Sequence, residues 1–161
     1  MQASKYAVLA SVIALVACGG GDQTPESAPP AAAPAATTPA AGSAPITGTT
    51  QVVQMVLNAA GEYRFEPAAL TIKAGDGIRF DFISGGPHNV AFDVAQFASN
   101  PAAKTALMAN MTEPIADLSG KMLNAVGESY TLSFGNVPPG TYEANCTPHL
   151  AMGMKMQITV Q

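Results

Sequence analysis

A chain of 161 residues is long enough for one folded domain with appendages and too short for two ordinary ones. Charged residues make up only 11% of the chain and the formal net charge is -4, which excludes the strongly basic surface that nucleic-acid binding needs. The 15 glycines and 13 prolines, with only 6% aromatic residues, favour short strands and turns over long helices. We therefore expect a mostly β protein that does not bind nucleic acid.

The N-terminal segment has the layout of a secretory signal. Lys5 precedes an apolar run over residues 6–16 that is too short to cross a membrane as a helix. The run leads into Leu15-Val16-Ala17-Cys18, which resembles the lipobox of bacterial lipoproteins. The resemblance implies that residues 1–17 are a cleaved signal peptide and that Cys18 carries a lipid, anchoring the exported protein on the periplasmic side of a bacterial membrane. An ordinary signal peptide with an incidental cysteine is the alternative.

Residues 18–49 are expected to form a disordered tether, because they consist almost entirely of Ala, Pro, Gly, Ser and Thr and offer little to bury. The prolines favour extended polyproline II structure in such a segment. This composition fits either a spacer whose length matters for function or a dispensable low-complexity segment. If Cys18 is acylated, Cys146 has no disulfide partner in an oxidising compartment, so another group, such as a metal ion, should occupy its sulfur.

From residue 51 onward, apolar and polar residues alternate with period two, which predicts half-buried strands. The segments with strand character are residues 51–57, 63–65, 70–73, 78–82, 88–93, 130–134, 141–146 and 154–160. Asn100-Pro101 predicts the start of a short helix over residues 102–110, inside a stretch, residues 94–127, that otherwise has no clear pattern. Short strands joined by Gly and Pro turns are typical of an antiparallel Greek-key sandwich, so an all-β fold of about eight strands is expected over residues 50–161.

Residues with metal-binding side chains cluster near the end of the chain, in Cys146-Thr147-Pro148-His149-Leu150-Ala151-Met152-Gly153-Met154. A thiolate, an imidazole and a thioether together suit a copper ion that changes oxidation state, because soft sulfur favours Cu(I) and nitrogen accommodates Cu(II). A second histidine would complete this set, and His88 is the only other histidine in the chain. His88, Cys146 and Met154 are each in phase with the inward-facing residues of their strands.

The chain from about residue 51 to residue 161 resembles the cupredoxins, the small blue copper proteins. Its terminal cluster is similar to the plastocyanin ligand loop, in which Cys-Thr/Ser-Pro-His is followed by Gly-Met with the methionine five residues after the histidine. Pro87-His88-Asn89-Val90 is similar to the first-histidine motif of plastocyanin, whereas the helical insertion is closer to auracyanin and azurin. The resemblance implies one type 1 copper ion bound by His88, Cys146, His149 and Met154.

The resemblance also implies how neighbouring residues tune the copper site. The backbone N–H of Asn89 would donate to the Cys146 sulfur, and its side chain would tie the two ligand loops together. Pro148 has no N–H, so a second donor to the sulfur is missing at that position. Redox partners would dock briefly on a small apolar patch around His149, and the protein would be a monomer. We place Met152 in this surface patch rather than among the ligands.

The sequence therefore predicts a membrane-tethered one-electron carrier and not an enzyme. A copper-handling lipoprotein, which delivers or buffers the metal, is the alternative. A thiol enzyme with Cys146 as nucleophile and His149 as base is disfavoured, because two residues three apart around a proline are poorly placed for activation. A buried cysteine, hydrogen-bonded histidines and a packed methionine could each be structural. Their joint occurrence in one known pattern favours the metal site.

Overall fold

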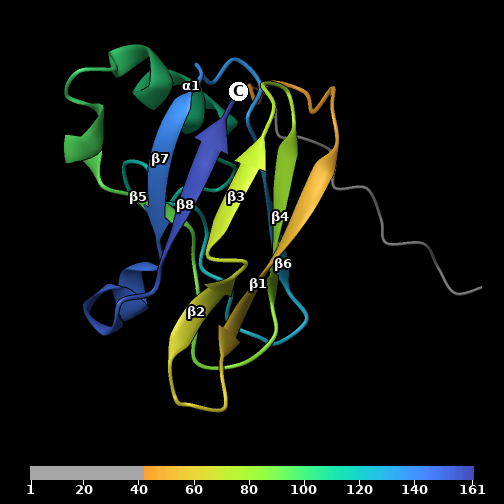
Figure 1. Cartoon of the computed structure of the whole chain (residues 1–161), viewed down its shortest axis with the longest axis vertical. Coiled ribbons are helices and arrows are strands. Elements are labelled where there is room, and N and C mark those ends of the chain that lie inside the picture. Colours follow the sequence, from red (N-terminus) through yellow and green to blue (C-terminus); the bar gives the residue numbers. More distant parts are fainter. Residues whose placement is uncertain (1–41) are drawn as a thin grey trace, which may run out of the picture. The chain divides into compact units, whose positions relative to one another are not determined.

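The computed structural model describes residues 42–161 (Figure 1). The predicted signal peptide, residues 1–17, and the predicted lipidation site, Cys18, lie outside the described residues. The described chain contains eight strands, one α-helix and two 3-10 helices, which are labelled η. None of these helices is both long and apolar enough to span a membrane. In chain order the elements are β1 (Thr50–Leu57), β2 (Tyr63–Glu66), β3 (Ala69–Ile72), β4 (Gly77–Phe82), β5 (Ala91–Phe92), η1 (Val94–Phe97), α1 (Pro101–Asn110), β6 (Ser129–Ser133), β7 (Gly140–Asn145), η2 (Thr147–Met152) and β8 (Lys155–Val160).

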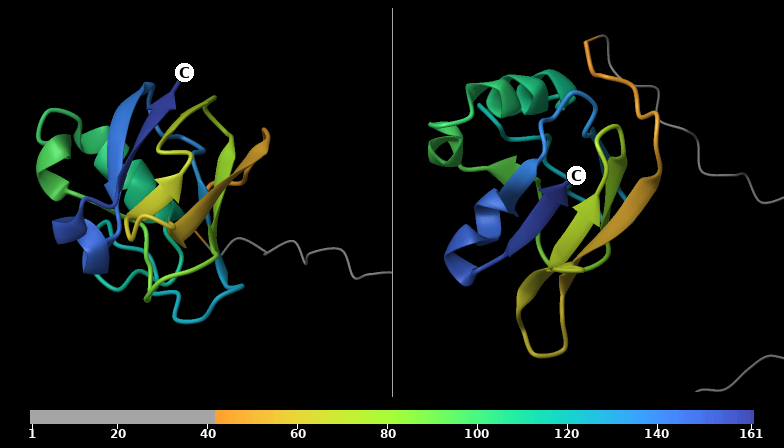
Figure 2. Two further views of the ribbon diagram at one scale, coloured as in Figure 1. Left: turned by 60° about the horizontal axis from the view of Figure 1, so that its bottom comes forward. Right: turned by 45° about the horizontal axis from the view of Figure 1, so that its top comes forward.

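Two four-stranded sheets, with strand orders β2-β1-β4-β6 and β3-β8-β7-β5, pack around one core (Figure 2). Most neighbouring strands are antiparallel, and the predicted all-β Greek-key sandwich is confirmed. Two pairs, β1 with β4 and β3 with β8, are instead parallel. The parallel β1–β4 pair arises because the chain crosses to the other sheet for β3 before it returns as β4 beside β1.

The alternation along β4 shows how the sequence defines the core. Ile78, Phe80 and Phe82 are buried between the sheets. Arg79 and Asp81 lie on the other face, where guanidinium nitrogens donate to the two carboxylate oxygens at 2.9 and 3.0 Å. Because neighbouring side chains of a strand point to opposite faces, this pattern fixes the face that β4 presents to the core.

The segment between β5 and β6 covers one edge of the sandwich (Figure 1). The predicted helix lies in this segment and is observed as α1. Asn100 precedes it, and Asn100 Oδ1 accepts the N–H of Ala103 at 3.1 Å. After α1 the chain has little regular structure, but Leu118 and Leu123 are buried. His88 and Leu123 exchange backbone hydrogen bonds of 3.0 and 2.8 Å, so this irregular stretch holds the His88 backbone.

Residues 43–49, assigned to the tether from the sequence, lie against the end of the sandwich at which β1 begins (Figure 1). The Ala44 N–H donates to Asn110 Oδ1 at 2.8 Å, and the Thr49 N–H donates to Asp76 Oδ1 at 2.7 Å. The buried Asn110 side chain donates in turn to two backbone carbonyls at the end of β6. We call residues 43–49 with these contacts the N-terminal clip. The 8 residues of β1 place its other end about 25 Å away.

Candidate metal centre

Three buried side chains that can bind a metal converge where β1 ends, far from the N-terminal clip. His88 lies in the connection between β4 and β5, Cys146 directly follows β7, and His149 lies in η2. Their donor atoms all lie within 4.8 Å of one another. The Cys146 sulfur is 3.6 Å from His88 Nδ1 and 3.4 Å from His149 Nδ1. The structure therefore brings together three of the residues predicted to bind copper.

The surroundings of His88 leave its Nδ1 available to a metal. Its Nε2 lies 3.0 Å from the carbonyl oxygen of Ser84, a residue whose hydroxyl also bonds Leu57 at the end of β1. A carbonyl can only accept, so Nε2 carries the ring proton and Nδ1 keeps its lone pair toward the Cys146 sulfur. Burial lowers the pKa of His88, and the Ser84 carbonyl acts in the opposite direction. The imidazole is therefore neutral at pH 7, as metal binding requires.

The loop that carries Cys146 and His149 is closed by backbone hydrogen bonds. The Cys146 carbonyl accepts the His149 N–H at 3.0 Å, and the Cys146 N–H donates to the Met154 carbonyl at 3.1 Å. Gly153 adopts a left-handed conformation, with φ at 82°, which ends η2 and turns the chain into β8. The Met154 side chain is consequently fully buried at this end of the sandwich, whereas that of Met152 is 59% exposed.

The electrostatics of the sulfur favour a bound cation. Burial raises the pKa of the Cys146 thiol, and the backbone N–H groups of Asn89 and His149 act in the opposite direction. Pro148, between Cys146 and His149, has no N–H to contribute. Burial and the positive charge that His88 can carry both lower the pKa of His149. A buried thiol without a cation resists ionisation, so a metal ion would supply the charge that a thiolate needs here.

The Asn89 side chain joins the two loops that carry the histidines. It is only 1% exposed, and its Oδ1 accepts the Thr147 N–H at 2.8 Å. Its Nδ2 donates to the hydroxyl oxygens of Ser119 at 2.9 Å and Thr147 at 3.1 Å. A single buried amide therefore fixes the β4–β5 connection, the η2 loop and the irregular stretch after α1 relative to one another.

Sequence reasoning missed the aromatic residues that contact the histidines. Tyr63 stacks on His149, with ring centroids 3.7 Å apart and an interplanar angle of 12°. Phe82 packs edge-on against His88, with ring centroids 4.8 Å apart. Strand alternation indicates that Phe82 faces inward, but no spacing in the sequence links residue 63 with residue 149.

The donor set suits copper. Two neutral imidazoles and one sulfur combine the nitrogen that Cu(II) accepts with the soft ligand that Cu(I) prefers, and the buried Met154 adds a thioether to the same end. Within residues 42–161 no carboxylate joins this cluster, so the oxygen ligands that Ca²⁺ and Mg²⁺ prefer are missing. These residues fit one type 1 copper ion.

Comparisons with known proteins agree with this assignment. Residues 51–161 match the family described as copper binding proteins, plastocyanin/azurin family. The plastocyanin of Scenedesmus fuscus is 39% identical over 102 residues, which cover 63% of this chain and 90% of that protein. The chloroplastic plastocyanin of Pisum sativum is 36% identical over 121 residues, which cover 74% of this chain but only 66% of that protein.

A solved structure shows the same architecture. The oxidised form of plastocyanin from Dryopteris crassirhizoma superposes with a TM-score of 0.53 at 28% sequence identity, and the match covers 69% of this chain and 100% of that one. The family match spans the whole described sandwich from β1 to β8 apart from its first residue. The chain therefore belongs to the plastocyanin/azurin family, the cupredoxins, whose members carry electrons on a single type 1 copper ion rather than act as enzymes.

Proposed function

We propose that this protein is a membrane-tethered one-electron carrier whose copper ion is bound by His88, Cys146, His149 and Met154. The observation that carries the proposal is the convergence of two imidazole Nδ1 atoms on one buried sulfur, at 3.4 and 3.6 Å. A bound copper ion supplies a centre that gains and loses one electron between Cu(II) and Cu(I). Nitrogen and sulfur donors together are acceptable to both oxidation states.

The chain holds these donors in place through its own hydrogen bonds. The Ser84 carbonyl orients His88, and the Asn89 side chain ties the His88 connection to the η2 loop. The backbone bond from Cys146 to Met154 closes the η2 loop from its other side. Because the donors already lie in one buried cluster, a change of oxidation state requires little movement of the protein. Small rearrangement keeps electron transfer fast.

The surface beside His149 supports a docking site for redox partners. His149 is 5% exposed, whereas His88 is fully buried, so His149 is the histidine nearer to the surface. Pro87, Leu150 and Met152, in the same two loops, are exposed and apolar. Brief redox contacts bury little area, so a patch of this size suits a partner that must leave quickly. We infer a monomer that exchanges electrons through His149.

The proposed anchor rests on the sequence around Cys18. Its lipobox-like layout supports an exported lipoprotein held on the periplasmic side of a bacterial membrane. We expect the full chain, expressed in a bacterium, to fractionate with membranes, and the Cys18→Ser variant to appear in the soluble periplasmic fraction. A Cys18→Ser protein that stays with the membranes would contradict the lipid anchor.

The carrier function is tested by loading the purified protein with Cu(II). We expect an intense visible absorption, an EPR spectrum with small copper hyperfine coupling, and repeated reduction and re-oxidation without loss of the metal. A copper-handling lipoprotein, the alternative, would release Cu(I) to a chelator within the first cycles. Copper binding without the intense absorption would contradict a type 1 centre.

Replacing Met154 with leucine is expected to raise the reduction potential while copper stays bound. The thioether is a weak donor that stabilises Cu(II) slightly, and leucine fills a similar volume without donating. Voltammetry of the copper-loaded variant measures the change. Met152→Leu is the matched control, because Met152 is 59% exposed and should leave the potential unchanged. A shift in the control and none in Met154→Leu would move the axial role to Met152.

A further inference from the structure

Tyr63 covers one face of the His149 ring. It is the first residue of β2 and pairs with Leu57, the last residue of β1. The two rings are nearly parallel, at 12°, with centroids 3.7 Å apart. The tyrosine is half-buried and packs against the core while its ring stacks on one face of the imidazole. His149 is the histidine nearer to solvent, and this contact accounts for part of its burial.

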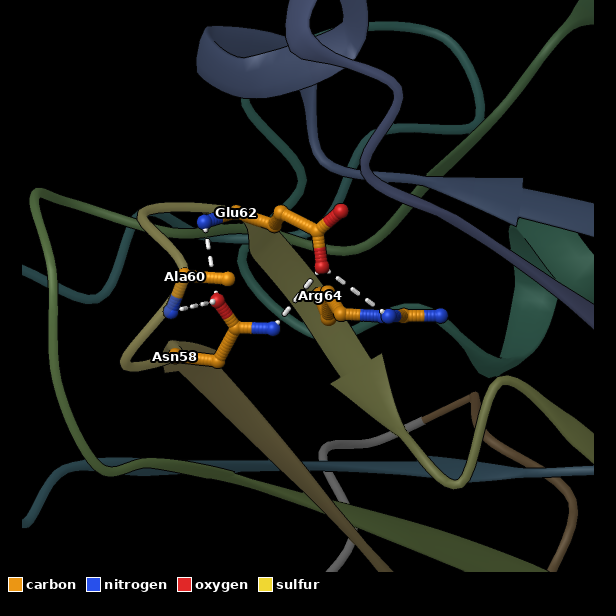
Figure 3. Close-up of polar contacts among 4 residues, drawn as sticks. All are labelled: Asn58, Ala60, Glu62 and Arg64. Carbon is orange, nitrogen blue, oxygen red and sulfur yellow. Dashed lines mark hydrogen bonds and ion pairs between the residues drawn. The ribbon is translucent and has the colours of Figure 1, made fainter.

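The turn before Tyr63 is held by a network of polar contacts (Figure 3). Asn58 Oδ1 accepts the N–H groups of Ala60 and Glu62 at 3.0 and 2.9 Å. Asn58 Nδ2 donates to the Glu62 carboxylate at 2.9 Å, and Arg64 donates to the same oxygen at 3.1 Å. These contacts fix the β1–β2 hairpin on both sides of Tyr63. The Tyr63 ring is therefore positioned against His149 by a hydrogen-bonded hairpin rather than by an irregular loop.

The loop before His88 leaves room for the tyrosine ring. A Cβ added at Gly85 would lie 2.9 Å from Tyr63 Cε1, closer than side chains tolerate, and Gly85 also has a φ of 99°. A Cβ added at the next residue, Gly86, would make only an ordinary contact, 3.5 Å from His149 Nε2. Two adjacent glycines thus differ in whether a methyl group would displace Tyr63.

We propose that Tyr63 is a positioning residue of the copper centre, which fixes the tilt of the His149 imidazole and excludes water from one of its faces. This role rests on the proposed function, because it matters only if His149 binds copper. Stacked aromatic pairs contribute about 0.5–1.5 kcal/mol beyond area burial, which corresponds to about a 2- to 10-fold change in an equilibrium. Excluding water also disfavours the more highly charged Cu(II) form, so the cover favours Cu(I).

The stack is tested first in the metal-free protein. A ring stacked on His149 should shift its carbon-bound ring protons upfield in the NMR spectrum. We expect Tyr63→Phe to keep this shift and Tyr63→Leu to lose it. Gly85→Ala should reduce the shift because its methyl group displaces Tyr63, whereas the matched control Gly86→Ala should retain it. A wild-type spectrum without the shift would overturn the inference.

The role is tested second in the copper-loaded protein. We expect Tyr63→Leu to release copper to a chelator about 2- to 10-fold faster, with Tyr63→Phe restoring the wild-type rate. Tyr63→Ala should lower the reduction potential, since water then reaches the imidazole. Wild-type release rates and potentials in the leucine and alanine variants would overturn the positioning role even if the NMR shift is lost. A wild-type protein that binds no copper would overturn the proposed function as well.

Discussion

Replacing Cys146 with serine is expected to abolish the intense visible absorption of the copper-loaded protein. The sulfur lies between His88 Nδ1 and His149 Nδ1, and neither histidine can supply the soft donor that a thiolate provides. A serine hydroxyl is a harder and much weaker ligand, so we expect both the colour and most of the copper affinity to disappear. Absorption and EPR spectra recorded during titration with Cu(II) measure the two losses.

The chain provides its own control for this experiment. Cys18 is the only other cysteine, and Cys18→Ser should leave the spectrum unchanged. Because Cys146 is fully buried, the serine variant also replaces a sulfur with a smaller hydroxyl inside the protein, so its folding is checked separately. Circular dichroism should confirm that the variant is folded before its spectrum is compared. A folded Cys146→Ser protein that remains blue would show that another residue binds the copper.

Replacing Asn89 with alanine is expected to destabilise the metal-free protein by about 2–4 kcal/mol. The side chain makes three hydrogen bonds, two with Thr147 and one with Ser119, and it is 1% exposed. Alanine removes these bonds, including the one to the buried Ser119 hydroxyl, and leaves the Thr147 N–H without its acceptor, which costs more than the loss of an exposed bond. Urea unfolding of the wild-type and variant proteins, without copper, measures the difference.

Asn124→Ala is the matched control for the Asn89 substitution. Asn124 is exposed and its side chain donates only one long bond, at 3.5 Å, to the Met122 carbonyl. Exposed substitutions of this kind usually change stability by less than about 0.5 kcal/mol. If Asn89→Ala costs no more than the control, the two ligand loops must be held together by backbone contacts instead.

The convergence of the metal-binding side chains could be predicted because its signals are local. Strand alternation places His88 and Cys146 on inward faces, and the spacing in the terminal cluster sets His149 and Met154 beside Cys146. In the structure the donor atoms of His88, Cys146 and His149 lie within 4.8 Å of one another. Met154 is buried at the same end. The alternation, the compact terminal motif and the presence of only one other histidine predicted these positions, and the resemblance to the cupredoxins joined them into one site.

The contacts that support the site could not be predicted, because they join distant parts of the chain. Tyr63 meets His149 only after β2 has been placed at the edge of its sheet. Ser119 lies in the stretch after α1, where some backbone groups bond within short turns, such as Ser119 to Ala116, and others bond to the distant His88 and Phe92. Short turns mixed with long-range bonds produce no helical or strand period in the sequence, so the packing of this stretch could not be predicted from hydrophobic alternation.

The N-terminal clip is the part of the domain on which a force applied to the preceding chain would act first. Force applied before residue 42 acts first on the hydrogen bonds from Ala44 to Asn110 and from Thr49 to Asp76. These bonds lie about 25 Å along β1 from the end that carries the histidines. A molecule anchored through its N-terminus would thus be held at the end of the sandwich opposite the metal centre.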